Sequence, residues 1–270
     1  MAPEDAGVEA IVAYVRVDNA VKYFPREDGS NMLVLDRVSF DTAEFGITCL
    51  LGPSGCGKST LLNVVSGLES LDGGRVEVVS DSRSSQKRSP KLGYVFQDAR
   101  LLSWKRVEDN LRFALKGMKI PQAEWPERLT KYLDLVGLAE FRGQYPLYLS
   151  GGMRQRVGLA RGLVIEPEVL LMDEPFSKLD QLTARRLRQE TLQICARLKQ
   201  TTVLVTHDVE EAAYMGDRIV ILRARPARIA EIYENPLKPG ERDVDDPRFI
   251  QFKKTLLQTV LQLMEKEALS

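Results

Sequence analysis

The sequence predicts an α/β fold with a mostly parallel sheet, an antiparallel β subdomain at the N-terminus and an inserted helical subdomain. Alternating apolar and polar residues near the N-terminus are typical of antiparallel strands. Short apolar runs alternate with helical patterns in the second half, which indicates a parallel sheet covered by helices. A stretch of purely helical pattern lies between the two. A chain of 270 residues can bury a core of this size.

The N-terminal strands are predicted from period-two alternation over residues 11–24 and 32–40. A turn-rich segment at residues 25–30 separates them, so the two strands should pair antiparallel. Residues 47–51 are almost continuously apolar, as a strand buried on both faces requires. This strand stops at a glycine-rich loop, and apolar residues at helical spacing follow over residues 58–67.

Further strands are expected at residues 75–79 and 92–96, joined by a polar linker at residues 80–90 that we interpret as solvated loop. The pattern then becomes helical over residues 98–163, which we interpret as the inserted subdomain. Its helices are predicted at residues 107–115, 123–136 and 152–163, with breaks at Pro121, Gly137 and Pro146.

The α/β alternation returns after this insertion. Strands are predicted at residues 169–172, 202–205 and 218–222, and helices at residues 182–198 and 209–215. The main domain should span residues 11–240, followed by a C-terminal helical extension at residues 241–270. One face of that extension is apolar and is expected to pack against the body; it carries Phe249, Phe252, Leu256, Val260, Leu263 and Met264.

Composition excludes several classes of protein. The 38 basic and 38 acidic side chains balance, so no nucleic-acid partner is expected. Three cysteines cannot form an even disulfide framework, which favours a reducing compartment, and Cys49 and Cys195 are expected to be small buried thiols. The acidic N-terminus lacks a signal core and no window is apolar enough to span a membrane, so we expect the chain to stay in the cytosol.

The glycine-rich loop fits the P-loop pattern and lies between a buried strand and a helix, as phosphate binding requires. It comprises Gly52, Pro53, Ser54, Gly55, Cys56, Gly57, Lys58, Ser59 and Thr60. Its backbone N–H groups and the positive end of the following helix attract phosphate oxygens. We expect Lys58 to reach the β and γ phosphates of ATP and Ser59 to ligate Mg²⁺. The core is therefore predicted to be a P-loop NTPase.

Two carboxylates end the apolar strand that begins at residue 169. Open α/β folds place ligands at this edge of the sheet. Asp173 is predicted to hold the magnesium shell, and Glu174 to polarise an attacking water. Two acids after a strand more often belong to a helix cap, but the P-loop upstream favours catalysis.

The segment at residues 149–156, Leu-Ser-Gly-Gly-Met-Arg-Gln-Arg, resembles the signature sequence of ABC ATPases, and it precedes the acidic strand as that family requires. The resemblance implies a head-to-tail dimer in which this helix terminus contacts the ATP held by a second ATPase subunit. The residues assigned to that contact are Ser150, Gly151, Gly152 and Gln155. Taken alone, Ser150 would be read as an ordinary helix cap.

Other positions match the same family in order. Gln97 resembles the glutamine that senses Mg²⁺ and the γ-phosphate, and Asp180 the aspartate that communicates across the dimer. Lys178 departs from the small residue usual before that aspartate. His207, the only histidine, resembles the histidine that contacts the γ-phosphate. Phe24 matches the aromatic residue that stacks on adenine, with Tyr23 as the alternative.

The stretch at residues 98–104 resembles the segment after the glutamine in ATPases of the nitrate, sulfonate and taurine importer group. The resemblance implies transmembrane permease subunits as partners, a solute-binding protein outside the cell, and a peripheral position on the cytoplasmic face of the membrane. Apolar residues around Trp104 either receive a helix of the permease or cap the helical subdomain. The alternative function is a non-transport ABC ATPase, for example in metal-cluster assembly.

Overall fold

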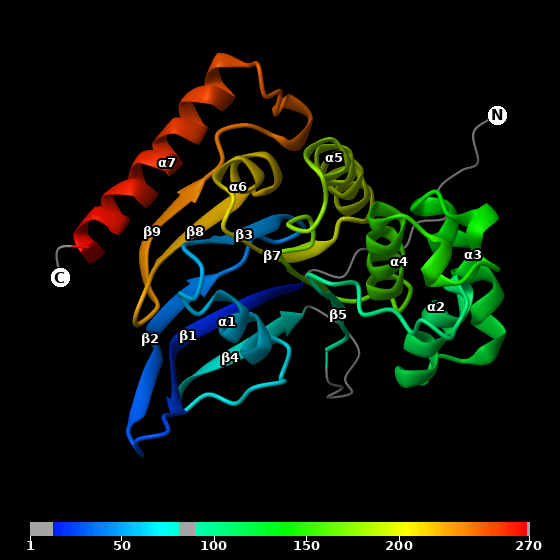
Figure 1. Cartoon of the computed structure of the whole chain (residues 1–270), viewed down its shortest axis with the longest axis horizontal. Helices are drawn as coiled ribbons and strands as arrows, with labels where there is room; N and C mark the ends of the chain where they lie inside the picture. Colours follow the sequence, from blue (N-terminus) through cyan, green and yellow to red (C-terminus); the bar gives the residue numbers. More distant parts are fainter. Residues whose placement is uncertain (1–12, 81–89, 269–270) are drawn as a thin grey trace.

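Two sheets and the helices around them make up the computed structural model, which describes residues 13–80 and 90–268 (Figure 1). The strands are β1 (Ala13–Pro25), β2 (Asn31–Asp41), β3 (Ile47–Leu51), β4 (Gly73–Ser80), β5 (Leu92–Val95), β6 (Val169–Asp173), β7 (Thr201–Thr206), β8 (Arg218–Arg223) and β9 (Arg228–Glu234). The helices are α1 (Lys58–Val65), α2 (Val107–Gly117), α3 (Trp125–Leu135), α4 (Gly151–Leu163), α5 (Gln181–Leu198), α6 (Val209–Met215) and α7 (Pro247–Ala268).

The smaller sheet has the order β2-β1-β4 and is antiparallel throughout. The predicted antiparallel pair of N-terminal strands is confirmed by the pairing of β1 with β2. The first two residues of the predicted strand, the acidic N-terminus and most of the linker expected at residues 80–90 lie outside the described residues. Buried and solvent-facing side chains alternate along β1, because only one face of this sheet meets the core.

The larger sheet has the order β5-β6-β7-β3-β8-β9. Its first five strands are parallel, as predicted, whereas β9 pairs antiparallel with β8 at the edge. Sequence reasoning missed β9 because the strand is polar and mostly solvent-facing, with charged residues at Arg228, Glu231 and Glu234. An edge strand of this kind lacks the apolar pattern that identifies buried strands.

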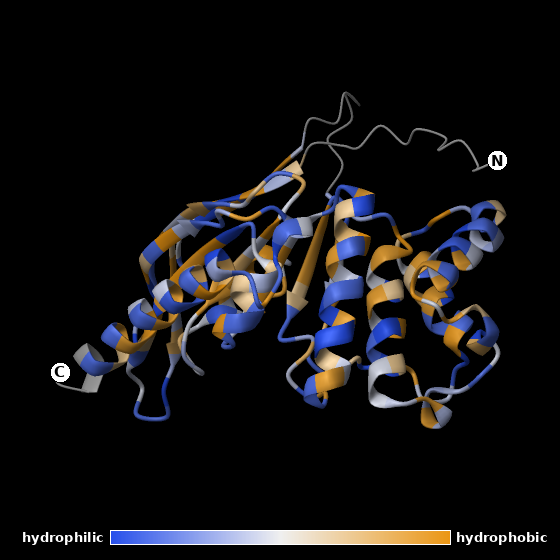
Figure 2. Cartoon of the chain, turned by 90° about the horizontal axis from the view of Figure 1, so that it is seen from above, coloured by the Kyte–Doolittle hydropathy of each residue, from blue (hydrophilic) through white to orange (hydrophobic). Residues whose placement is uncertain are grey.

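Helix α1 lies between the two sheets, and α4 to α7 cover the other face of the larger sheet (Figure 1). One core joins β1, β2, α1 and one face of the parallel strands. The other core joins the opposite face of those strands to α4, α5, α6 and α7 and to the helices α2 and α3. In Figure 2 hydrophobic and hydrophilic residues alternate along the helices, as expected of helices with one buried face.

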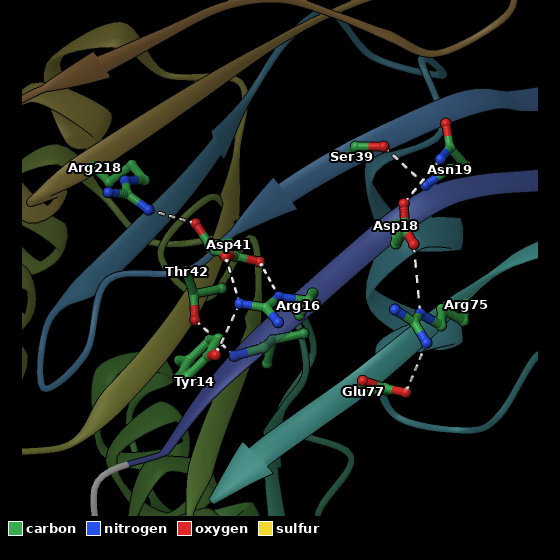
Figure 3. A network of polar contacts seen from close by, with 11 residues as sticks. Tyr14, Arg16, Asp18, Asn19, Ser39, Asp41, Thr42, Arg75, Glu77 and Arg218 are labelled. Atoms are coloured by element: carbon green, nitrogen blue, oxygen red, sulfur yellow. Dashed lines mark hydrogen bonds and ion pairs between the residues drawn. The ribbon is translucent and has the colours of Figure 1, made fainter.

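Polar contacts fix the antiparallel sheet against the larger one (Figure 3). Arg16 on β1 donates from Nε to Oδ1 of Asp41 at 3.1 Å and from Nη2 to the hydroxyl of Tyr14 at 2.9 Å. Arg218 on β8 donates to the backbone carbonyl of Asp41 at 2.7 Å. Thr201 on β7 donates to the carbonyl of Ala13 at 2.6 Å. The end of this strand pair that holds Ala13 and Asp41 is therefore tied to the parallel sheet.

The predicted helices between residues 107 and 163 are confirmed as α2, α3 and α4, with short 3₁₀ turns between them. Buried leucines hold α2 and α3 together, among them Leu111, Leu115, Leu129 and Leu133. The division into an ATPase domain at residues 11–240, with an insertion at 98–163, and an extension at 241–270 stays a prediction.

The C-terminal helix α7 packs on the body through Phe249, Phe252 and Leu256, which are buried. Met264 was predicted on the same face, but half of it is exposed. The physical reason is helical periodicity: eight residues advance the helix by about 80° beyond two full turns, so Met264 is rotated away from Leu256. It falls instead beside the exposed Leu257 and Leu261.

All three cysteines are buried, which confirms the prediction for Cys49 and Cys195. Burial raises the pKa of both of these thiols above the ordinary value. Across residues 13–80 and 90–268, no helix has both the length and the apolar character that crossing a membrane demands.

Candidate functional site

The site lies at the edge of the larger sheet where four neighbouring parallel strands end. β5, β6, β7 and β3 are adjacent in that order, and the chain leaves each of them at the same edge. The segments that follow carry Gln97 after β5, Glu174 after β6, His207 after β7 and the P-loop after β3. Residues far apart in the sequence are thereby brought to one place.

The P-loop conformation depends on its glycines. Gly55 and Gly57 have φ of 76° and 100°, a region that residues with a Cβ avoid. A Cβ at Gly52 would lie 2.6 Å from the carbonyl oxygen of Leu222, so only glycine fits beneath the loop. Ser54 and Gly55 are exposed at the tip. Backbone amides of the loop are thus accessible to an anion at the N-terminus of α1.

Lys58 and Ser59 begin α1 and point into the site. The Lys58 ammonium is buried and donates to the carbonyls of Gly52 and Pro53, each at 2.8 Å. The Ser59 hydroxyl donates to Oδ1 of Asp173 at 3.0 Å. The predicted pair of a P-loop hydroxyl and a strand-end carboxylate is therefore assembled within hydrogen-bond distance.

Glu174 contacts two other predicted residues, Gln97 and His207. Its Oε2 lies 3.3 Å from Nε2 of Gln97 and 3.1 Å from Nδ1 of His207. Gln97 also donates to the hydroxyl of Ser177 at 3.0 Å, and Ser177 donates to the backbone carbonyl of Glu174 at 2.9 Å. Glutamate, glutamine and histidine thus form one cluster of polar contacts beside the P-loop.

Glu174 has an unusual backbone conformation, and Asp173 has a shifted pKa. Glu174 has φ of 43°, an uncommon value for a residue with a side chain, and its N–H donates to the carbonyl of Val205 at 3.0 Å. Burial raises the pKa of Asp173 above its ordinary value, and the charge of Glu174 adds to that effect. The hydroxyl of Ser59 and the ammonium of Lys58 act in the opposite direction.

The signature motif opens α4. Ser150 and Gly151 are exposed, and the Ser150 hydroxyl accepts a bond from the N–H of Met153 at 3.2 Å. Gly152 is buried against α5, where an added Cβ would lie 2.8 Å from Cγ2 of Thr183. The N-terminus of α4 therefore faces outward beside the start of α5 and can receive an anion from a second molecule.

Gln155 does not share that outward surface. Its side chain is buried, and Nε2 donates to the backbone carbonyl of Phe96 at 3.1 Å. The prediction that Gln155 contacts the ATP of a second subunit does not fit this placement. The reason is that α4 packs on β5, so Gln155 points inward and links the signature helix to the residue before Gln97.

Asp180 caps α5, because its Oδ1 accepts the N–H of Thr183 at 3.0 Å. This bond lowers the pKa of the Asp180 carboxyl. Lys178, the residue that departs from the family pattern, lies 3.6 Å from the carboxylate of Asp98 in an exposed ion pair. Together with the bond from Gln97 to Ser177, it ties the segment before α5 to the segment after β5.

The two candidate aromatics lie near the end of β1. The Lys22 ammonium lies 5.2 Å from the ring centroid of Phe24, so these two side chains share a face. Lys22 is buried and pairs at 3.7 Å with Glu69 and with Asp72, which follow α1. Tyr23 is 42% exposed and, by strand alternation, points to the opposite face.

Sequence reasoning missed three residues near the cluster. Ser177 bonds Gln97, Arg188 is buried 3.7 Å from Asp208, and Glu211 is buried one turn after His207. The available signal for Glu211 was a second acidic side chain, directly after Glu210, in the first turn of a short helix that continues mostly with apolar residues. Its burial depends on α5, which no local pattern shows.

An exposed apolar surface lies on the helical region. It comprises Trp104, Phe113, Tyr145, Leu147 and Tyr148, of which Leu147 is 79% and Trp104 70% exposed. The guanidinium of Arg106 lies 5.7 Å from the ring centroid of Tyr145, and the N–H of Val107 donates to the carbonyl of Gln144 at 2.9 Å. The start of α2 is therefore joined to the segment before the signature motif.

Comparison with known proteins is consistent with this geometry. A family model described as ABC transporter matches residues 35–177. The taurine import ATP-binding protein of Rhizobium johnstonii is 41% identical over 237 residues, which cover 88% of this chain and 90% of that protein. The nitrate import ATP-binding protein of Synechococcus elongatus is 39% identical over 251 residues, which cover 90% of each chain.

A solved structure shares the fold. It is an ATP-binding cassette in a dimeric, post-hydrolysis state bound to ADP and Pi, with a TM-score of 0.68 and 26% identity. The match covers 83% of this chain and 100% of that chain.

Proposed function

Because this chain belongs to the ABC transporter family, we propose that it is the ATP-binding and ATP-hydrolysing subunit of an importer. The observation that carries the proposal is the convergence of Lys58, the Ser59–Asp173 pair and the Glu174 cluster at one edge of the sheet. A phosphate cradle, a pair of oxygen ligands and a general base are the parts that hydrolysis of a phosphoanhydride needs.

In the proposed binding step, the P-loop amides and the N-terminus of α1 hold the phosphates of ATP. Lys58 exchanges its bonds to the carbonyls of Gly52 and Pro53 for bonds to the β and γ phosphates. Phe24 stacks on the adenine, with Tyr23 as the alternative. We favour Phe24 because it shares a face with Lys22, and Lys22 pairs with a residue just beyond α1.

Ser59 and Asp173 fit a magnesium ion. Their oxygens are the hard donors that Mg²⁺ prefers, and they already lie 3.0 Å apart. Gln97, beside Glu174, is proposed to complete this site. A bound magnesium ion would offset the negative charge of the phosphates.

Hydrolysis is proposed to use Glu174 as the base that takes a proton from the attacking water. Its Oε2 is held by Gln97 and His207 in the chain without nucleotide. When ATP binds, Gln97 is proposed to turn to the magnesium site and the γ-phosphate, and His207 to the γ-phosphate, which frees Glu174 for the water. Lys58 then stabilises the charge that develops on the phosphate oxygens.

The complete site is proposed to need two chains arranged head to tail. The exposed start of α4, at Ser150 and Gly151, supports a contact with the γ-phosphate held by the second subunit. Asp180 and Lys178 border this terminus and are proposed to lie at the interface. A dimeric solved relative supports an assembly of two chains.

The exposed apolar surface around Trp104 is proposed to receive a helix of a membrane permease. The chain would then act as a peripheral subunit at the cytoplasmic face of the membrane, supplied by a solute-binding protein on the other side. The names of its relatives support nitrate, a sulfonate, taurine or a similar small solute as cargo.

The test is Mg²⁺-dependent ATP hydrolysis after expression with and without the neighbouring membrane-protein genes. Stimulated hydrolysis in a complex with a permease would support the importer subunit. Full activity with only soluble partners would instead indicate a non-transport ATPase, such as one that assembles metal clusters.

A further inference from the structure

Glu211 is a buried carboxyl next to the hydrolysis cluster. It lies in the first turn of α6, four residues after His207, and only 5% of it is exposed. Within residues 13–80 and 90–268, its Oε1 has no hydrogen-bond partner. Burying a polar atom without a partner is costly, so such an atom in a native core needs an explanation.

Charged groups from several elements face this carboxyl. They are Arg188 from α5, Asp208 from the start of α6 and Glu174 from the end of β6. The neutral thiol of Cys49 on β3 lies nearby, and the hydroxyl of Thr206 hydrogen-bonds the same carboxyl. Arg188 is itself buried, and its Nη1 lies 3.7 Å from Oδ2 of Asp208. Burial raises the pKa of Glu211 to about 8, with Arg188 acting in the opposite direction.

The turn that carries His207 is held from both sides. Thr206 accepts the N–H of Asp208 at 3.0 Å, and Asp208 accepts the N–H groups of Glu210 and Glu211 at 2.8 Å and 3.3 Å. Arg188 reaches this turn from α5, whose first residues follow the Asp180 cap. A displacement of α5 would therefore shift the turn and His207 with it. Nδ1 of His207 lies 3.1 Å from the carboxylate of Glu174.

We propose that Glu211 is a positioning residue for ATP hydrolysis: together with Arg188 it fixes the turn at residues 206–208 and so holds His207 in place. This inference rests on the proposed function. Glu211 does not touch the reacting atoms; it acts through its side-chain hydrogen bond with Thr206 and through the charges of Asp208 and Arg188.

The protonation state of the Glu211 carboxyl determines whether Arg188 interacts with Asp208 alone or with both carboxylates. A neutral Glu211 leaves the guanidinium of Arg188 to Asp208, which keeps the turn in place. An ionised Glu211 competes with Asp208 for Arg188 and adds a negative charge that faces Glu174. The sign follows from the raised pKa: the neutral form prevails at neutral pH, and the charged form appears as the pH rises through about 8.

The experiment measures kcat and KM for ATP from about pH 6.5 to about pH 9.5. It compares the wild type, Glu211→Gln, Glu211→Ala and the matched control Glu210→Gln, each in the intact permease complex. Glu210 is the preceding residue, but its carboxylate is 42% exposed and pairs with Lys253. The control therefore makes the same chemical change outside the buried cluster.

Glu211→Gln keeps a neutral side chain of the same shape at every pH. We expect the kcat of the wild type to fall above about pH 8. The kcat of Glu211→Gln should stay within about twofold of the wild type at neutral pH and should not show this fall. Glu211→Ala should lower kcat about tenfold at every pH, while KM changes by less than about twofold. Glu210→Gln should follow the wild type throughout.

An alkaline fall that persists unchanged in Glu211→Gln would overturn the inference, and so would a wild-type kcat in Glu211→Ala. Should Glu211→Ala fail to fold, the pH profile of Glu211→Gln decides alone. A wild-type complex that does not hydrolyse ATP would instead refute the proposed function itself. The two failures are thereby distinguished.

Discussion

Replacing Glu211 with glutamine should make stability less dependent on pH. Between about pH 4.5 and about pH 8, the folded chain keeps a proton on Glu211 that the unfolded chain releases. The free energy of unfolding of the wild type therefore falls as pH rises through this window, and the contribution is fully present only below about pH 4.5. Glutamine has no proton to lose and removes this dependence.

The size of the effect follows from the two pKa values, about 8 in the folded chain and 4.5 in the reference state. Each pH unit between them corresponds to about 1.4 kcal/mol. The variant should gain about 3 kcal/mol over the wild type between about pH 4.5 and pH 7, and about 4 kcal/mol by pH 8.

The assay is urea unfolding of both proteins at several pH values, with the difference in unfolding free energy plotted against pH. Any fixed cost of the glutamine amide shifts the whole curve and leaves its slope unchanged. A difference that stays constant from about pH 5 to about pH 8 would refute the reasoning, because Glu211 would then be ionised in the folded chain as well.

Three further predictions concern binding, packing and assembly. Lys58→Ala should weaken ATP binding about a hundredfold, since it removes a charge-assisted bond to the phosphates; an affinity like that of the wild type in a nucleotide titration would speak against this role. Phe252→Ala, which empties a buried site, should lower the free energy of unfolding by about 3 kcal/mol, whereas Ile250→Ala on the exposed side of α7 should change it by less than about 1 kcal/mol. Trp104→Ala should leave ATP affinity intact but weaken capture of the permease by about 2 kcal/mol, and undiminished co-purification would place the docking surface elsewhere.

The parts of the fold that sequence patterns predict are those whose signal is local. The continuous apolar run at β3, the glycines of the P-loop and the strand that ends at Asp173 each show their role in neighbouring residues. Parallel pairing follows because helices alternate with these strands. Their convergence at one sheet edge is then a consequence of topology.

The features that were missed depend on contacts between distant segments. The polar edge strand β9 is defined by its pairing with β8 and by little else. Gln155 belongs to a motif with exposed residues, yet α4 turns its side chain toward Phe96. The burial of Glu211 depends on α5, which is separated from α6 in the chain by strand β7. Local pattern carries no information on such packing.

The proposed mechanism requires Glu174 to drive hydrolysis of ATP held between two copies of this chain. The most direct measurement is the mass in solution, with phosphate release, of Glu174→Gln with and without ATP and Mg²⁺. We expect a dimer that forms only with ATP and releases no phosphate, because the nucleotide is bound but not cleaved. Phosphate release at the wild-type rate would contradict this role of Glu174.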